Sequence, residues 1–477
     1  VVEIGDESEN NNLDGSEDVG GETSEKDNAK HGEDALVDTH GETQHDCDRR
    51  ARHALSSLGF EFRLDLCQKC RVDNDPPQDT NCKDDNGGDS IVCPECATRL
   101  YHVPSNTAVN KDNRRTYIAD GKMYESVANL CQASAQEIMA EKCDLLWVTI
   151  CDGKGGGLRA QFKEQHHPPS KPKTISIEEW PRDEHGNIIV QEPIRALVGR
   201  HPHGMDANHP HDTFLVATGK GKVRAGIFSR HHLMTTGLEQ STALPLLCEA
   251  RKRGMNCVVV DPNARGDRCG MDTFEVSVRS LFEQQSCLKE VEDEDDTKDR
   301  PANVNGSIYV LAHSAAGGQL VRYLLDQQRD APLLSRICCI TFTDSTHSVQ
   351  SLKKHPHIST MIQSSKTLYV RSANPMRDDN YENASPGDEC PHDPFWKHRF
   401  GDVKTVWAGT TEHSLSNWTA HKPIWDHFDK VRGDSQGTIE PSIAEKGHES
   451  KIDANGPDER TNNGKSAAVI GTKPVVI

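Results

Sequence analysis

The chain has 477 residues, of which 34% are hydrophobic, and it carries a formal net charge of −19. This length allows two or three domains, while the low apolar fraction indicates that part of the chain contributes to no hydrophobic core. The negative charge argues against binding a nucleic-acid backbone through the bulk surface. The sequence shows no apolar segment of membrane-spanning length and no signal peptide, so a membrane is not expected as a partner.

Both ends of the chain are strongly polar. Residues 1–48 contain sixteen Asp and Glu side chains against two Lys. Such a segment buries too little apolar surface to offset the entropy that is lost when its backbone is ordered. We therefore expect an acidic disordered arm at residues 1–52 and a disordered tail at residues 432–477.

Two Cys-x-x-Cys pairs follow a predicted strand at residues 58–64, namely Cys67 with Cys70 and Cys93 with Cys96. Four thiolates at this spacing suit one tetrahedral zinc ion, and four cysteines leave no open coordination position for water. The pairs therefore predict a structural zinc site in an insertion at residues 67–96, and no organic cofactor is expected. The alternative is four reduced cysteines in a polar insertion, which a reducing compartment such as the cytosol or nucleus would maintain.

An amphipathic pattern predicts a helix at residues 122–142, and a strand is expected at residues 145–150. A loop at residues 200–210 is rich in histidine, a common metal ligand. The spacing is irregular and interrupted by proline, so solvated histidines are a better interpretation than a metal site. The histidines in question are His201, His203, His209 and His211.

Strand and helix patterns alternate through the second half of the chain. This alternation predicts a mostly parallel, doubly wound sheet, in which ligands bind at the C-terminal ends of the strands. The expected strands are residues 213–218, 257–260, 308–312, 337–343, 367–371 and 403–408, and the expected helices are residues 243–253, 274–285 and a last one around Trp425 and Phe428.

Residues 307–329 have the layout of a nucleophile elbow. An apolar strand leads into His313-Ser314-Ala315-Ala316-Gly317-Gly318, and an amphipathic helix follows. A sharp turn of this kind lifts a serine hydroxyl above the sheet and aims the next backbone N–H at a reacting carbonyl oxygen. The alternative is an ordinary buried strand-to-helix turn of an α/β protein.

The remaining parts of an acyl-transfer site also follow predicted strands. Asp344 comes directly after the next strand, Asp378 and Asp379 come after the one beyond it, and His413 lies just past the last strand. The order Ser, Asp, His is that of α/β-hydrolases. We predict a triad of Ser314, His413 and Asp344, with Asp378 as the alternative acid, because Asp344 leaves an apolar strand directly whereas Asp378 lies in a polar loop where a solvated carboxylate is expected.

An oxyanion hole is expected beside this triad, formed by backbone N–H groups. The loop after the strand at residues 213–218 provides some of these groups, and the residue after the serine provides another. The residues concerned are Gly219, Lys220, Gly221 and Ala315.

Five short segments carry a family resemblance. They are VRAG at 223–226, VVVDPN at 258–263, AHSAAGG at 312–318, TDSTH at 343–347 and GTTEH at 409–413. In these segments the sequence resembles the argonaute-binding-protein-two domain family, including its animal cotranscriptional-regulator relatives. The resemblance covers most of residues 54–430 and excludes the cysteine pairs and the acidic runs.

The resemblance implies an α/β-hydrolase-like fold in which a serine at the position of Ser314 is regarded as the nucleophile. It divides the chain into an N-terminal part at residues 53–178 and an α/β-hydrolase-like domain at residues 179–431. Two departures from the family concern the site. Residues 218–221 read TGKG where the family typically has HGSG, and residues 375–378 read PMRD where the family has PLD.

The resemblance also implies a role. Members of the family bind argonaute proteins and act in small-RNA-guided heterochromatin formation or chromatin-coupled RNA processing. We accordingly expect a nuclear protein, present in the cytoplasm as well, with argonaute or chromatin-associated partners through which small RNA is reached. The alternative function is a serine hydrolase that cleaves an ester, thioester or amide through its Ser-His-Asp triad.

Overall fold

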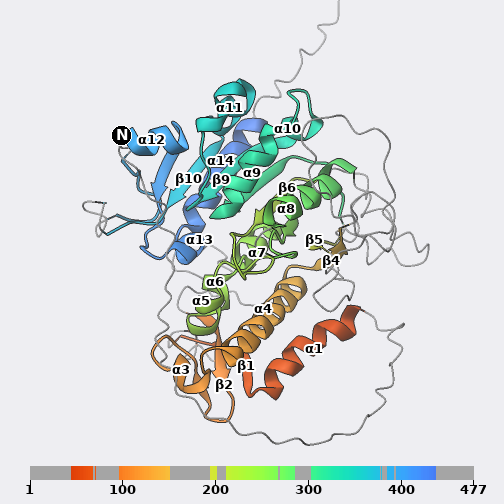
Figure 1. Cartoon of the computed structure of the whole chain (residues 1–477), viewed down its shortest axis with the longest axis vertical. Helices are drawn as coiled ribbons and strands as arrows, with labels where there is room; N and C mark the ends of the chain where they lie inside the picture. Colours follow the sequence, from red (N-terminus) through yellow and green to blue (C-terminus); the bar gives the residue numbers. More distant parts are fainter. Residues whose placement is uncertain are drawn as a thin grey trace, which may run out of the picture. The chain divides into compact units, whose positions relative to one another are not determined.

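The computed structural model describes residues 44–67, 70, 96–150, 194–200, 211–266, 269–284, 302–375, 378, 384–391 and 394–436. Within these residues an eight-stranded sheet forms the centre (Figure 1). Its strands are β4 (Leu145–Thr149), β5 (Arg195–Gly199), β6 (Thr213–Ala217), β7 (Asn256–Val260), β8 (Ile308–His313), β9 (Ile337–Thr343), β10 (Thr367–Arg371) and β11 (Lys404–Trp407).

The strand order identifies the fold. Across the sheet the order is β11-β10-β9-β8-β6-β7-β5-β4. Only β5 runs against the others, since it is antiparallel to both β4 and β7, and all remaining pairs are parallel. This is the strand order of the α/β-hydrolase fold. The prediction of an α/β-hydrolase-like, mostly parallel sheet is confirmed.

Helices cover both faces of the sheet. The described residues contain the helices α1 (Gln44–Ser57), α3 (Arg114–Tyr117), α4 (Lys122–Lys142), α5 (Arg230–Thr235), α6 (Leu238–Ser241), α7 (Leu244–Lys252), α8 (Gly270–Val278), α9 (Ala315–Leu325), α10 (Pro332–Arg336), α11 (Pro356–Ile362), α12 (Pro394–Phe400), α13 (Ser416–Thr419) and α14 (His421–Gln436), of which only some lie on the sheet. A π-helical turn, η3 (Arg279–Gln284), continues α8, and 3₁₀ turns form η6 (Gln350–Lys354) and η8 (His413–Leu415).

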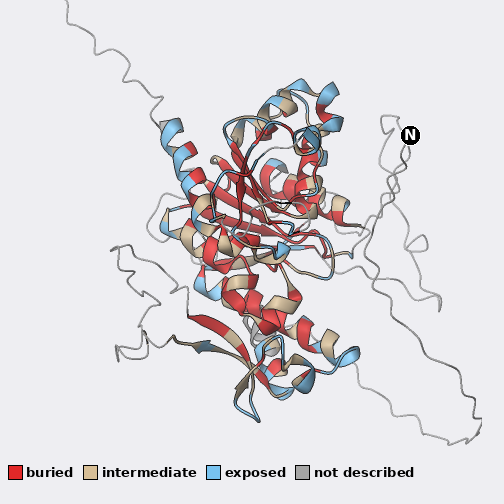
Figure 2. Cartoon of the chain, turned by 90° about the vertical axis from the view of Figure 1, so that its left-hand side faces the viewer, coloured by how far each residue is buried: buried red, intermediate tan, exposed pale blue. Residues whose placement is uncertain are grey.

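Strand β6 shows why the sheet is buried on both sides. Its residues TFLVA are all buried, as a central parallel strand requires. Phe214 and Val216 belong to a hydrophobic cluster that includes residues of α4, α7 and α14, whereas Leu215 and Ala217 belong to a second cluster that includes residues of α8, α9 and α11. Figure 2 shows the resulting sheet as an almost continuous buried layer.

A small antiparallel sheet precedes the main one in the chain. It consists of β1 (Phe60–Asp65), β2 (Ala97–His102) and β3 (Thr107–Ala108). The buried Glu239 carboxylate of α6 accepts hydrogen bonds from the backbone N–H and the hydroxyl of Thr98, both at 2.7 Å. Two hydrogen bonds to one buried carboxylate hold β2 firmly against the helices of the larger sheet.

The structure differs from the predicted elements in several places. Strand β5 was not predicted, and the expected helix at residues 274–285 is divided between α8 and η3. Helix α1 begins at Gln44, inside the expected acidic arm, and α14 continues to Gln436, past the expected boundary at residue 431. Among the helices of the described residues, none is both long enough and apolar enough to cross a membrane.

Three buried histidines make the stability of the fold dependent on pH. Burial lowers the pKa of His313 and His347 to about 3 and that of His427 to about 4. Because these values lie below the pKa of about 6.5 in an unfolded chain, each histidine contributes stability that is complete above about pH 6.5 and is lost as the pH falls. Each is expected to cost about 2 kcal/mol between pH 6.5 and pH 5.

This dependence is measured by urea unfolding at about pH 7.5 and about pH 5. A His347→Phe variant retains a ring for stacking on Phe342, whose centroid lies 4.0 Å from that of His347, but loses the titrating group. We expect its unfolding free energy to fall less on acidification than that of the parent chain. An identical pH dependence in both proteins would contradict the assignment.

Candidate active site

Ser314 lies in a strained turn between β8 and α9. Its backbone has φ 54° and ψ −124°, in a region that L-residues rarely adopt. Such strain persists only where the surrounding structure imposes it, and it gathers at functional sites. The turn is tightly packed, since a Cβ added at Gly317 would lie 1.8 Å from the Ser345 hydroxyl oxygen. The residue therefore has the geometry of a nucleophile elbow.

Asp344 occupies the equivalent place at the end of the neighbouring strand β9. It too has a positive φ, 44°. Its Oδ1 accepts a hydrogen bond of 2.7 Å from the backbone N–H of Ser372, which fixes the carboxylate. Its Oδ2 is buried, has no hydrogen-bond partner among the described residues and lies 3.4 Å from Nδ1 of His413.

His413 begins η8, after β11. Its side chain is 52% exposed, against 9% for Asp344, so the pair joins a buried carboxylate to an accessible imidazole. The His413 ring also lies against His313, the residue before Ser314, with 4.7 Å between the ring centroids. With Nδ1 directed at Asp344, Nε2 is the nitrogen left to act on a nucleophile. The structure thus brings Asp344 and His413 together beside the Ser314 turn.

Asp378, the alternative acid, is engaged elsewhere. Both of its carboxylate oxygens accept hydrogen bonds from Arg371 Nη2, at 2.7 and 3.0 Å. Its side chain is only 9% exposed. The expectation of a solvated carboxylate at this position is therefore wrong. Arg371, the last residue of β10, pairs with the Asp378 carboxylate in a largely buried position. Asp379 lies outside the described residues.

The loop expected to form the oxyanion hole lies directly against the serine. A Cβ added at Gly219 would be 2.8 Å from Ser314 Cβ and 3.2 Å from its Oγ, so only glycine fits there. Lys220 and Gly221 follow in the same loop. Ala315 is the first residue of α9, where backbone N–H groups have no acceptor within the helix. Gly219 thus places the loop against the serine on one side, and the first turn of α9 follows it in the chain.

The predicted metal ligands are brought together in part. Cys67, Cys70 and Cys96 have their sulfur atoms within 4.8 Å of one another. Cys93 lies outside the described residues, as do three of the four loop histidines; the fourth, His211, precedes β6.

The amino-acid sequence is similar to those of several named proteins. The chain resembles vertebrate cotranscriptional regulators. It is 20% identical over 293 residues to Cotranscriptional regulator ARB2A of Mus musculus and 20% identical over 288 residues to that of Homo sapiens, in each case across 51% of this chain. It spans 64% of the length of either relative, slightly less than two thirds. No family model matches the chain.

Two hydrolases are among the solved structures that align with part of this chain. A putative carboxylesterase from Lactobacillus plantarum aligns with a TM-score of 0.28 and 12% identity, across 52% of this chain and 94% of its own. An S-formylglutathione hydrolase from Agrobacterium tumefaciens aligns with a TM-score of 0.27 and 10% identity, across 50% of this chain and 90% of its own.

Two residues at the site, His313 and Asn417, were not predicted from the sequence to have a role there. His313 is buried, and its Nδ1 lies 3.1 Å from both Thr343 Oγ1 and Asn417 Nδ2. Asn417 is four residues beyond His413, so this contact ties the segment that carries His413 to the strand that carries Ser314. Burial, and then the neighbouring His413, lower the pKa of His313 to about 3, which keeps its ring neutral. The polar His313 within an apolar strand was the available signal.

A third missed residue holds the oxyanion loop. The Asn263 side-chain amide donates to the carbonyl oxygens of Gly219 and Val223, at 2.8 and 2.9 Å. Arg224 also binds the buried Asp261 at the end of β7, with 2.8 Å between Nε and Oδ2. These contacts connect VRAG with VVVDPN, two of the segments that carried the family resemblance.

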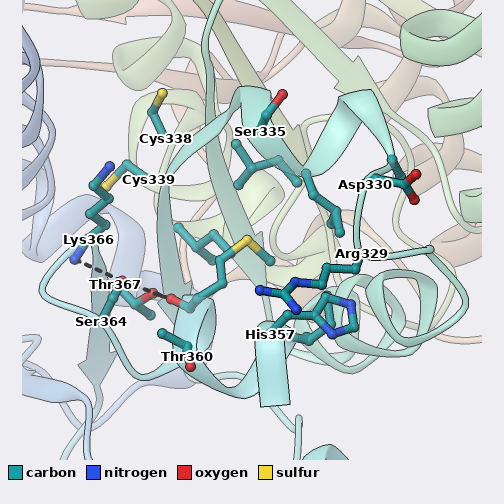
Figure 3. A pocket seen from close by; sticks show the side chains of 16 residues that line it. Arg329, Asp330, Ser335, Cys338, Cys339, His357, Thr360, Ser364, Lys366 and Thr367 are labelled. Carbon is teal, nitrogen blue, oxygen red and sulfur yellow. Dashed lines mark hydrogen bonds between the residues drawn. The ribbon is translucent and has the colours of Figure 1, made fainter. Parts of the chain in front are cut away.

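A cavity of about 490 Å³ lies at the N-terminal ends of the strands, opposite the end that carries Ser314. It is lined by residues at the N-terminal ends of β9 and β10, including Ile337 and Thr367, and by parts of α10 and α11 (Figure 3). Ser314 and Asp344 follow the C-terminal ends of their strands. The cavity is therefore separate from the candidate active site.

Proposed function

We propose that this protein acts in the nucleus in cotranscriptional or small-RNA-guided regulation of gene expression, with argonaute or chromatin-associated proteins as partners. The observation that carries the proposal is the sequence similarity to proteins named cotranscriptional regulators, which extends over half of the chain. The net charge of −19 makes the bulk surface unfavourable for a nucleic-acid backbone, so RNA is reached through the partner. The protein then serves as an α/β-hydrolase-like scaffold for assembly.

The test is immunoprecipitation of the full chain from native nuclei, with and without ribonuclease, followed by detection of argonaute proteins. A protein partner is expected to remain after ribonuclease treatment. A Ser314→Ala variant serves as the matched control, because a scaffold retains its partner when only the hydroxyl is removed. Absence of argonaute and chromatin proteins from both samples, with the chain outside the nuclear fraction, would overturn the proposal.

A serine hydrolase acting on an ester, thioester or amide is the second candidate. It is favoured by one observation: a buried carboxylate oxygen 3.4 Å from His413, beside a strained serine. In this chemistry Ser314 Oγ attacks the acyl carbon while His413 Nε2 takes its proton, and Asp344 stabilises the imidazolium. The bond from the acyl carbon to the alcohol, thiol or amine then breaks as His413 returns the proton to that leaving group, and a water deprotonated by His413 hydrolyses the acyl-enzyme to the acid and free Ser314. The backbone N–H groups of Ala315 and of the Gly219 loop would bind the oxyanion.

The hydrolase candidate is tested with a fluorophosphonate probe, an electrophile that reacts rapidly with an activated serine hydroxyl. Labelling of the parent chain at Ser314, and its loss in Ser314→Ala, is the expected result. Labelling at another residue, or none in a folded protein, would remove this candidate and leave the scaffold.

A further inference from the structure

We propose that Cys67, Cys70 and Cys96 bind one zinc ion at the end of the β1–β2 ladder. Their sulfur atoms all lie within 4.8 Å of one another. Ligands of a tetrahedral zinc–thiolate centre, with Zn–S of about 2.3 Å, are separated by about 3.8 Å. The three thiols therefore need to move by only a small amount to share one ion.

Hydrogen bonds to sulfur support the same assignment independently. The backbone N–H of Cys67 donates to Cys96 Sγ at 3.3 Å, and that of Cys70 donates to Cys67 Sγ at 3.5 Å. Each of these bonds fixes an acceptor sulfur atom against the neighbouring backbone. Backbone donors around the ligands also orient them and tune the centre. A buried cysteine that acts only as a small apolar side chain has no need of a backbone N–H group directed at its sulfur atom.

The position of the cluster explains what the ion would do. Asp65, the last residue of β1, pairs with Ala97, the first residue of β2. Cys67 and Cys96 flank this pair, at the point where the chain leaves the ladder and later returns. One residue beyond Ala97, Thr98 binds Glu239 of α6. The ion would thus link the two ends of the long connection between β1 and β2. It would also fix the start of β2, where Thr98 holds the small sheet against α6.

The place of the three thiols at the end of the β1–β2 ladder favours a structural role for the ion. Cys96 is buried and its two partners are half-buried. The spacing of the two Cys-x-x-Cys pairs predicts Cys93 as a fourth ligand, and the three thiols named above are those that the structure brings together. A disulfide would use two of these sulfur atoms and leave the third without a role.

The experiment is metal analysis of the full chain, purified under reducing conditions without chelator. We expect about one zinc per chain, loss of that zinc in Cys67→Ser and in Cys96→Ser, and full retention in Cys338→Ser, a half-buried cysteine at the start of β9. A parent chain without zinc, retention of zinc by both ligand variants, or a disulfide between two of the three cysteines would each overturn the proposal.

Amide hydrogen exchange keeps the test informative if a variant folds poorly. Removal of zinc from the parent chain by a chelator should speed exchange in β2 at least about tenfold and leave β8 unchanged, because β8 lies in the larger core. Zinc added back should restore protection. Equal exchange in β2 with and without the ion would contradict the structural role.

Discussion

An Asp344→Asn variant is expected to react with a fluorophosphonate about 10⁴-fold more slowly than the parent chain, if Ser314 is activated by His413. The substitution would place an amide N–H, a hydrogen-bond donor, opposite Nδ1 of His413, where Asp344 has a carboxylate oxygen, an acceptor. The imidazole would then favour the tautomer that places a proton on Nε2, and it would no longer accept the proton of Ser314. The fold should tolerate the change, because the amide oxygen can still accept the hydrogen bond from Ser372 N–H.

Asp378→Asn is the matched control, since it makes the same substitution at the competing acid. Its reaction rate should remain within a few-fold of the parent rate, measured at low temperature on the folded fraction. The opposite ranking of the two variants would transfer the role of the acid to Asp378. Equal, fast labelling of both would show that His413 works without a carboxylate.

The fold was predictable because its signals are local. Continuous apolar runs such as TFLVA in β6 and NCVVV in β7 indicate buried parallel strands, and turns with small residues separate them from amphipathic helices. Strand β5 was missed, since its sequence RALVG has an apolar run of only Ala, Leu and Val between Arg195 and Gly199, shorter than the runs of β6 and β7. The π-helical turn after α8 leaves no comparable sequence signal.

The part of the candidate site that could be predicted is the placing of its residues at the C-terminal ends of the strands. Ser314, Asp344 and His413 each follow a strand, and parallel strands end at the same edge. The contact between His313 and Asn417 was not predictable, because it joins residues 104 positions apart through side chains alone. The same limit explains Asp378, whose polar surroundings in the sequence gave no sign of an arginine seven residues earlier that would bury it.

Replacing Asp378 by asparagine is expected to lower the free energy of unfolding by about 3–5 kcal/mol. Its partner Arg371 is 11% exposed, with its guanidinium 4.1 Å from the ring centroid of Trp396 and 5.1 Å from that of Trp407. Removing the carboxylate leaves this cation buried without its counter-charge, which costs far more than the pair itself contributes.

Urea unfolding of Asp378→Asn and of Asp426→Asn separates this effect from the loss of any aspartate. Asp426 pairs with Lys422 on α14, and the two side chains are 61% and 82% exposed, so its loss should cost at most about 0.5 kcal/mol. A double variant, Arg371→Met with Asp378→Leu, should regain much of the lost stability, because it removes the buried charge together with its partner. If Asp378→Asn instead unfolds at the parent midpoint, water reaches Arg371, and the polar loop is solvated after all. The outcome therefore decides whether this carboxylate, the alternative acid for His413, is part of the core.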